Sequence, residues 1–332
     1  MTPALSRIGK RRAAQATLAV CAGLALLAWW LLPLRDTPAA RGTVSFSTGV
    51  PTGVYWRYGD LLKERLADDL PEVDVRLETS EGSVQNLQRL VSGQANFTIA
   101  TADAVAAYRE ANPRGARQLR ACARLYDDYL QLVVPEDSEV TRAADLKGKR
   151  VAIGQPGSGV SLITHRLLRA AGLDPEEDIT AVRVGIDRMP EMLREGRIDA
   201  FFWSGGLPTG AVADLAGEEP VRLVQLGDLL GELHRQGPDM WQYRAALVPA
   251  DAYPEVRRGR AVKTVAVANL LVTTVGTDPG LTEGITRTVI DNRDRIGQEV
   301  HAAQLVDLRT AIFTDPLDLH RGAKRYYRSV KS

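Results

Sequence analysis

Residues 264–274 read TVAVANLLVTT, a long β-rich run without a charged side chain. Strands in globular proteins are usually about 3–10 residues long, so a run of this length suits a strand that crosses between two lobes. Residues 130–134, LQLVV, form a second strand-like run, and we expect the two runs to be the crossover strands. At 332 residues the chain is long enough to bury two cores. The sequence therefore predicts a two-lobed protein that pivots on strands.

The rest of the chain from Gly42 onward alternates short β-like runs with helical periodicity, the pattern of an α/β fold. Strands are predicted at 44–47, 73–78 and 96–100, and amphipathic helices at 54–70 and 83–91. The pattern starts afresh after Pro135. We therefore expect lobe I to comprise residues 43–133 and 267–332 and lobe II to comprise residues 134–266, with residues 1–41 preceding both.

The N-terminal segment has the features of a membrane-insertion signal. An uncharged run at residues 13–34 is close to the ~20 apolar residues that cross a bilayer, and four basic residues precede it: Arg7, Lys10, Arg11 and Arg12. We expect a retained anchor helix with everything after Leu34 outside the cytoplasm. Cleavage after Ala40, which would secrete the protein, and lipid attachment at Cys21 are the alternatives.

Composition excludes several classes of function. The net charge of +1 gives no basic surface for nucleic acid. The only cysteines are Cys21 and Cys122, and the histidines are scattered, so the sequence predicts no disulfide framework, metal site or other cofactor. Cys122 lies in an apolar stretch and is expected to be a buried core thiol.

Four predicted strand-to-helix junctions are rich in Gly, Ser and Thr: STGVPTG at 47–53, TSEGS at 79–83, GQPGSG at 154–159 and WSGGLPT at 203–209. Such junctions converge at the carboxyl ends of parallel strands, where ligands bind. Glycine lets the backbone approach a ligand, and each following helix offers unpaired N–H groups. Small anions are the expected ligands, although each loop alone could be an ordinary turn or helix cap.

Enzymatic motifs are absent from these loops. A phosphate-binding P-loop needs Lys where Val160 stands, and a Gly-x-Ser-x-Gly elbow around Ser158 would need glycines at Pro156 and Val160. The acidic pair Asp127-Asp128 is interpreted as solvated charge. We therefore expect a binding protein and not an enzyme.

Three stretches carry a more specific resemblance: ETSEGSVQNLQRLVSGQANFTIATADAV, DLKGKRVAIGQPGSG and GRIDAFFWSGGLPTGAV. Together with STGVPTGVYWRYGDLL they resemble the TAXI family of solute-binding subunits of TRAP transporters. The resemblance implies the periplasmic-binding-protein type II fold, a membrane permease as partner, and a carboxylate or an amino acid such as glutamate as ligand. By position it implies ten ligand-binding residues: Ser47, Thr48, Thr52, Tyr55, Thr79, Ser83, Asn86, Ser158, Trp203 and Ser204.

Two departures from the family pattern concern the first loop. Val50-Pro51 replaces the usual glycine pair, which stiffens the loop, and Arg57 stands where an apolar residue or proline is common. Ligand identity should therefore not be transferred.

The expected function is an extracytoplasmic, monomeric receptor that captures a small organic anion between two lobes and delivers it to a TRAP permease. The alternative is a membrane-tethered sensor module that reports its ligand to a membrane partner. A biosynthetic enzyme on the same bilobal fold, as in pyrimidine-forming thiamine pathway proteins, is a third hypothesis, and the export signal argues against it.

Overall fold

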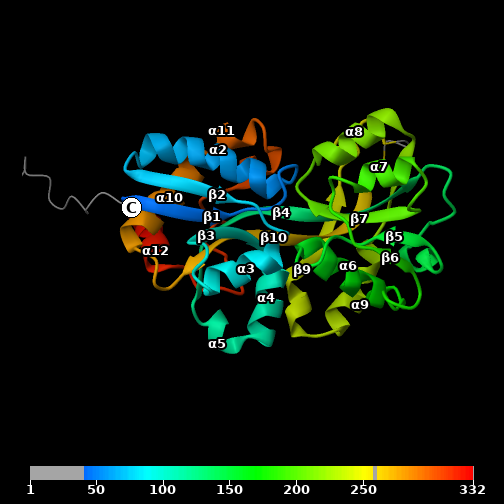
Figure 1. Ribbon diagram of the computed structural model, residues 1–332, viewed down its shortest axis with the longest axis horizontal. Coiled ribbons are helices and arrows are strands. Elements are labelled where there is room, and N and C mark those ends of the chain that lie inside the picture. The colour runs from blue at the N-terminus through cyan, green and yellow to red at the C-terminus, as the bar shows by residue number, and fades with distance from the viewer. Residues whose placement is uncertain (1–40, 257–259, 332) are drawn as a thin grey trace, which may run out of the picture. The chain divides into compact units, whose positions relative to one another are not determined.

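A computed structural model describes residues 41–256 and 260–331 (Figure 1). The expected membrane-insertion helix, with Cys21, lies outside these residues. Within the described part of the chain, no helix combines the length and apolarity needed to span a membrane.

The described strands form one mixed sheet. Its order is β2 (Val73–Glu78), β1 (Gly42–Ser47), β3 (Phe97–Thr101), β10 (Val262–Thr274), β4 (Leu119–Pro135), β7 (Ala200–Gly205), β5 (Arg150–Ala152) and β6 (Thr180–Val182). Off this path, β8 (Val221–Val224) pairs with β4, and β9 (Tyr243–Val248) pairs with β10. Strands β1, β2 and β3 are parallel to one another, as are β5, β6 and β7.

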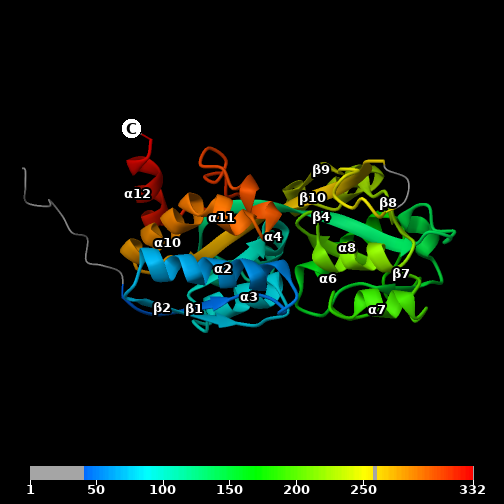
Figure 2. The same ribbon diagram turned by 90° about the horizontal axis from the view of Figure 1, so that it is seen from above.

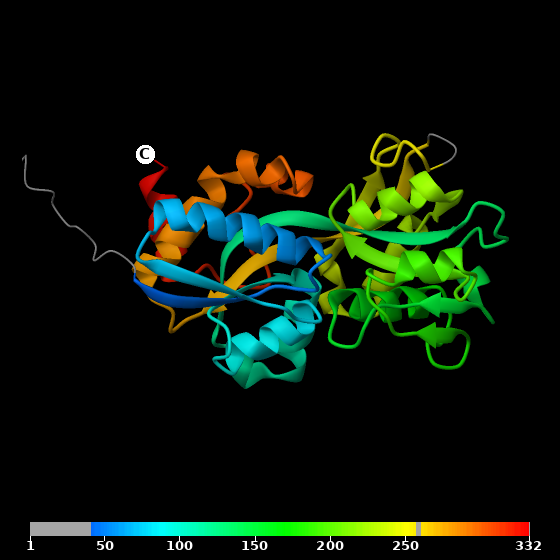
Figure 3. The same cartoon turned by 45° about the horizontal axis from the view of Figure 1, so that its top comes forward.

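Strands β4 and β10 run antiparallel to each other and pass through both lobes (Figure 3). The first half of β10 pairs with β9 and its second half with β3. Similarly, β4 pairs with β10 along its first part and with β7 and β8 along its last part. The predicted fold class, two α/β lobes joined by two crossover strands, is confirmed. The predicted strand at 130–134 is only the end of β4, which begins at Leu119.

Helices cover both faces of the sheet in each lobe (Figure 2). In the first lobe these are α2 (Val54–Asp69), α10 (Pro279–Asp291) and α12 (Arg321–Ser329) on one face and α3 (Ser83–Val91) and α4 (Ala102–Ala111) on the other. In the second lobe, α7 (Met189–Arg194) and α8 (Gly210–Glu218) lie on one face, and α6 (Gly159–Ala170) and α9 (Leu230–Arg235) lie on the other. The short elements are α5 (Pro113–Ala116), α11 (Arg293–Gly297), η1 (Ala143–Leu146), η2 (Gly227–Leu229), η3 (Pro238–Gln242) and η4 (His301–Leu305). We propose that residues 43–133 and 267–332 form the first lobe and that residues 134–266 form the second.

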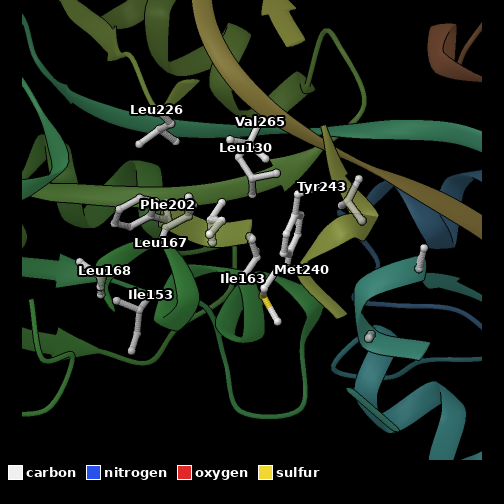
Figure 4. Packing of buried hydrophobic residues seen from close by; sticks show 14 of the residues in the cluster. Leu130, Ile153, Ile163, Leu167, Leu168, Phe202, Leu226, Met240, Tyr243 and Val265 are labelled. Atoms are coloured by element: carbon white, nitrogen blue, oxygen red, sulfur yellow. The ribbon is translucent and has the colours of Figure 1, made fainter. Parts of the chain in front are cut away.

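One hydrophobic cluster continues from the first lobe into the second on the face of the crossover strands that α3, α4, α6 and α9 cover. It joins Leu87 and Val105 of the first lobe to Leu167 and Phe202 of the second. Figure 4 shows Leu167 and Phe202 packed with their neighbours in this cluster. A second cluster lies on the opposite face of the first lobe, and Cys122 is fully buried in it, which confirms the expected core thiol. The lobes therefore share apolar packing as well as two strands.

A buried polar contact also joins the lobes. Asp103 on α4 is 1% exposed, and its Oδ2 accepts a hydrogen bond from Tyr243 Oη at 2.5 Å. Arg166 on α6 donates to the same Tyr243 oxygen at 2.8 Å and lies 3.4 Å from Asp103 Oδ2. The buried carboxylate therefore has a cationic partner from the opposite lobe, which limits its desolvation cost.

Asn86 on α3 links the end of strand β1 to the middle of strand β3. Its Nδ2 donates to the carbonyl oxygens of Thr48 (2.7 Å) and Ile99 (3.0 Å). Its Oδ1 accepts from the hydroxyls of Ser47 (2.6 Å) and Ser80 (2.7 Å). The side chain is fully buried, and both of its donors and both acceptor positions are used.

We predict that Asn86→Ala lowers the free energy of unfolding by about 3 kcal/mol or more, because it leaves several buried polar groups unpaired at once. Urea unfolding measures the loss. The control is Gln88→Ala on the exposed face of the same helix, for which we expect a change within about 0.5 kcal/mol. Equal stabilities of the two variants would contradict the structural role of Asn86.

Candidate functional site

A cavity between the lobes is lined by all four of the predicted loops. The first lobe contributes Gly49, Val50, Gly53, Val54, Tyr55, Glu81, Gly82, Ser83, Thr101 and Asp128. The remaining lining residues are Gly154, Gln155, Ser158, Gly159, Val160, Gly185, Ile186, Met189, Trp203, Ser204 and Gly205. The cavity volume is about 70 Å³. A single water needs roughly 10–15 Å³ on this scale, so the space suits a small molecule.

Five of the ten predicted site residues line this cavity: Tyr55, Ser83, Ser158, Trp203 and Ser204. The other five do not reach it. Ser47, Thr48 and Asn86 are buried in the scaffold, where the Thr48 hydroxyl donates to the carbonyl oxygen of Glu78 at 2.9 Å. Thr79 is exposed, and Thr52 borders a separate hollow beside Arg57.

Arg57 does not face the cavity. Its guanidinium is exposed and forms ion pairs with Asp60 and Glu299. This departure from the family pattern therefore lies at the surface.

Ser158 lines the cavity but its hydroxyl is engaged within its own loop. It caps α6 by accepting from Ser161 N at 3.0 Å, and it donates to the carbonyl oxygen of Gln155 at 2.7 Å. A ligand at this point would therefore meet the first backbone N–H groups of α6 more readily than the Ser158 hydroxyl.

The second and third loops touch each other across the lobes. Gln85 N donates to the carbonyl oxygen of Gly157 at 3.1 Å, and Gln155 Nε2 donates to that of Glu81 at 3.3 Å. A Cβ added at Gly159 would lie 3.1 Å from Ser83 Oγ, which is tight. These contacts close one side of the cavity.

A chain of hydrogen bonds crosses the cavity wall through both crossover strands. Tyr55 Oη donates to Asn269 Oδ1 at 2.5 Å, and Asn269 Nδ2 donates to Asp128 Oδ1 at 2.6 Å. Ser204 Oγ donates to Asp128 Oδ2 at 3.2 Å. Because the Tyr55 proton is used toward Asn269, the Ser83 hydroxyl, 3.0 Å away, donates to the Tyr55 oxygen. The chain links α2 and α3 of the first lobe to β7 of the second.

Asp128 is the unexpected member of this chain. The interpretation of Asp127-Asp128 as solvated charge was wrong for Asp128, which is 5% exposed. Adjacent strand residues point to opposite faces, so Asp127 forms ion pairs with Arg124 and Arg244 while Asp128 faces the cavity. This alternation is the signal in the sequence that could have identified Asp128.

Burial raises the pKa of Asp128 from its ordinary value to about 7. The hydrogen bonds from Asn269 and Ser204 favour the ionised form and oppose this rise, whereas the charge of Asp103 adds to it. Near neutral pH the site is therefore poised between a carboxylic acid and a carboxylate.

Thr101, also missed in the sequence, adds a second buried polar group. Its side chain is 3% exposed, and its Oγ1 has no hydrogen-bond partner among the described residues. It lines the cavity beside Ser83 and Gly159. A free buried hydroxyl costs stability unless a ligand or water satisfies it, which marks this wall as a contact point.

The chain matches the family described as NMT1-like over residues 46–330. Among solved structures, it is similar to the periplasmic aliphatic sulphonate binding protein SsuA from Escherichia coli, with 15% identity, TM-score 0.49, and 87% of this chain and 84% of that chain covered. An ancestral arginine-binding protein bound to arginine has 16% identity and a TM-score of 0.49, with 78% of this chain and 98% of that chain covered. A putative L-cystine ABC transporter from Listeria monocytogenes has 14% identity and a TM-score of 0.48, with 81% of this chain and 99% of that chain covered.

Two α/β lobes joined by two crossover strands are the arrangement of type II periplasmic binding proteins, as the resemblance to the TAXI family implied.

We predict that Asp128→Asn removes a pH-dependent loss of stability from the ligand-free protein. The pKa of Asp128 is raised in the folded state, so the parent is most stable below the unfolded pKa, near 4, and loses stability as pH rises toward about 7. The loss is on the order of 4 kcal/mol. The asparagine can still accept from Asn269 and donate to Ser204 Oγ.

Urea unfolding at about pH 4 and about pH 8 tests this expectation. The variant should gain stability relative to the parent at the higher pH and differ little at the lower one. An equal destabilisation at both pH values would contradict the raised pKa.

Proposed function

The chain belongs to the NMT1-like family, and on that premise we propose that it is the extracytoplasmic solute-binding receptor of a TRAP-type transporter. It captures a small organic acid, a carboxylate or an amino acid, between its lobes and delivers it to a membrane permease. The observation that carries the proposal is the cavity formed by loops of both lobes, because a ligand held there contacts both lobes at once. The TAXI-like signatures support the TRAP assignment, and the loops within these signatures line the cavity.

Delivery requires that the ligand favours one lobe arrangement over another. A ligand shifts a conformational equilibrium only by its difference in affinity for the two states. The loops at 79–83 and 154–159 come from different lobes and meet at the cavity, so closure completes the binding site. We propose that the receptor lies at the outer face of the membrane and that the N-terminal helix anchors it there.

Tryptophan emission reports closure in this proposal. Trp203 lines the cavity, whereas Trp241 is 69% exposed and stacks on His234 with ring centroids 4.4 Å apart. We predict a saturable emission change when the protein is titrated with its carboxylate or amino-acid ligand. Trp203→Phe should remove most of this signal, and the matched variant Trp241→Phe should retain it.

Small-angle scattering of the same samples measures compaction. The receptor proposal predicts a smaller radius of gyration at saturating ligand. A signal carried by Trp241 alone, or an unchanged radius at saturation, would contradict ligand-driven closure.

A further inference from the structure

The charges that line the cavity have one sign. Among its described lining residues, the charged ones are Asp128 and Glu81, and none is Lys, Arg or His. Glu81 is exposed, whereas Asp128 is 5% exposed. A dicarboxylate in this cavity would therefore meet buried like charge without a side-chain cation to balance it.

Four arginines elsewhere in the lobes contact groups other than the cavity. Arg166 lies against Asp103 and Tyr243, and Arg89 donates to Thr79 O at 2.6 Å. Two further pairs are Arg57 with Glu299 and Arg124 with Asp127.

The carboxylate of Asp128 has room for another donor. It accepts one hydrogen bond at each oxygen, from Asn269 and from Ser204, and a carboxylate offers about four acceptor positions. Thr101 Oγ1, which lines the same cavity, has no partner among the described residues. A group with several N–H donors would satisfy both.

The remaining wall is largely apolar. Val50, Val54, Ile186, Met189 and Trp203 line it. Such a surface favours an uncharged hydrocarbon group on the ligand and disfavours a second carboxylate.

We propose that Asp128 binds the ammonium group of the ligand, and that the ligand is an amino acid with an uncharged, largely apolar side chain. This proposal rests on the receptor function proposed above and narrows its ligand class. The ligand supplies the positive charge that the cavity lacks, and its carboxylate is left for the backbone N–H groups at the starts of α3 and α6.

The proposal predicts how the affinity for the ligand changes with pH. Burial raises the pKa of Asp128 to about 7, and an ammonium ligand needs the ionised form. Affinity should therefore fall about tenfold per pH unit below that value. An anion without an ammonium group would show the opposite trend, because it is repelled by the ionised form.

Other titratable groups that face Asp128 do not reverse this trend. Tyr55 on α2 and Tyr126 on β4 have pKa values raised well above the ordinary value by burial, so both stay neutral. Asp103 on α4 is paired with Arg166, and Glu81 lies exposed at the cavity. The uncharged neighbours are Asn269 on β10 and Ser204 on β7.

The test is titration calorimetry of the protein with leucine, valine, methionine and phenylalanine. Each amino acid is compared with its deaminated analogue, such as 4-methylpentanoate for leucine, and with succinate. We expect at least one of the four to bind, with an affinity roughly 100-fold above that of its deaminated analogue and of succinate.

Asp128→Asn should weaken binding of that amino acid roughly 100-fold and abolish its pH dependence. Binding of the deaminated analogue should not weaken in this variant, because the carboxylate that repels it is removed. Asp127→Asn is the matched control on the same strand and should bind like the parent, because Asp127 lies outside the cavity. Thermal unfolding verifies that both variants are folded.

Several results would overturn the proposal: failure of all four amino acids to bind, equal binding of the deaminated analogue, or affinity that rises as pH falls. If succinate or a deaminated acid binds and compacts the protein while the amino acids do not, the ammonium assignment fails and the receptor function stands. If no probe binds or compacts the protein, both fail.

Discussion

The hydrogen bond between Asp128 and Asn269 is the interaction on which the binding site depends, because it places a carboxylate inside the contact between the lobes. The two residues come from the crossover strands β4 and β10, which also form the connection between the lobes. Burying a carboxylate without a cation is costly, and hydrogen bonds from neutral groups only partly offset that cost. A proton or a positively charged ligand must supply the rest.

The same residues link ligand binding to the arrangement of the two lobes. The chain from Tyr55 through Asn269 and Asp128 to Ser204 begins in the first lobe and ends in the second. A ligand that changes the charge state of Asp128 alters hydrogen bonds to both lobes, whereas the separate Asp103 and Arg166 pair is already balanced. Asp103 therefore supports the contact between the lobes, whereas Asp128 is available to the proposed ligand.

Much of the fold was predictable because periodicity reports directly on burial. Helix 83–91 and strand 73–78 were predicted with their observed bounds, and all four loops line the cavity. The first half of β4 was missed because Arg124 and Asp127 interrupt its apolar pattern. Ser47 and Asn86 have the side chains of ligand-binding residues, yet they bond to each other in the scaffold. Whether such a group faces a ligand or a neighbouring strand depends on contacts distant in sequence.

The measurement that tests this account most directly is the ¹³C chemical shift of the Asp128 side-chain carboxyl, followed by NMR as pH is varied, without and with bound amino acid. We expect the carboxyl to titrate near pH 7 in the ligand-free protein and to remain ionised well below that pH in the complex, because the ammonium group stabilises the carboxylate. Titration near the ordinary value of about 4 in the ligand-free protein, or a protonated carboxyl in the complex at neutral pH, would contradict it.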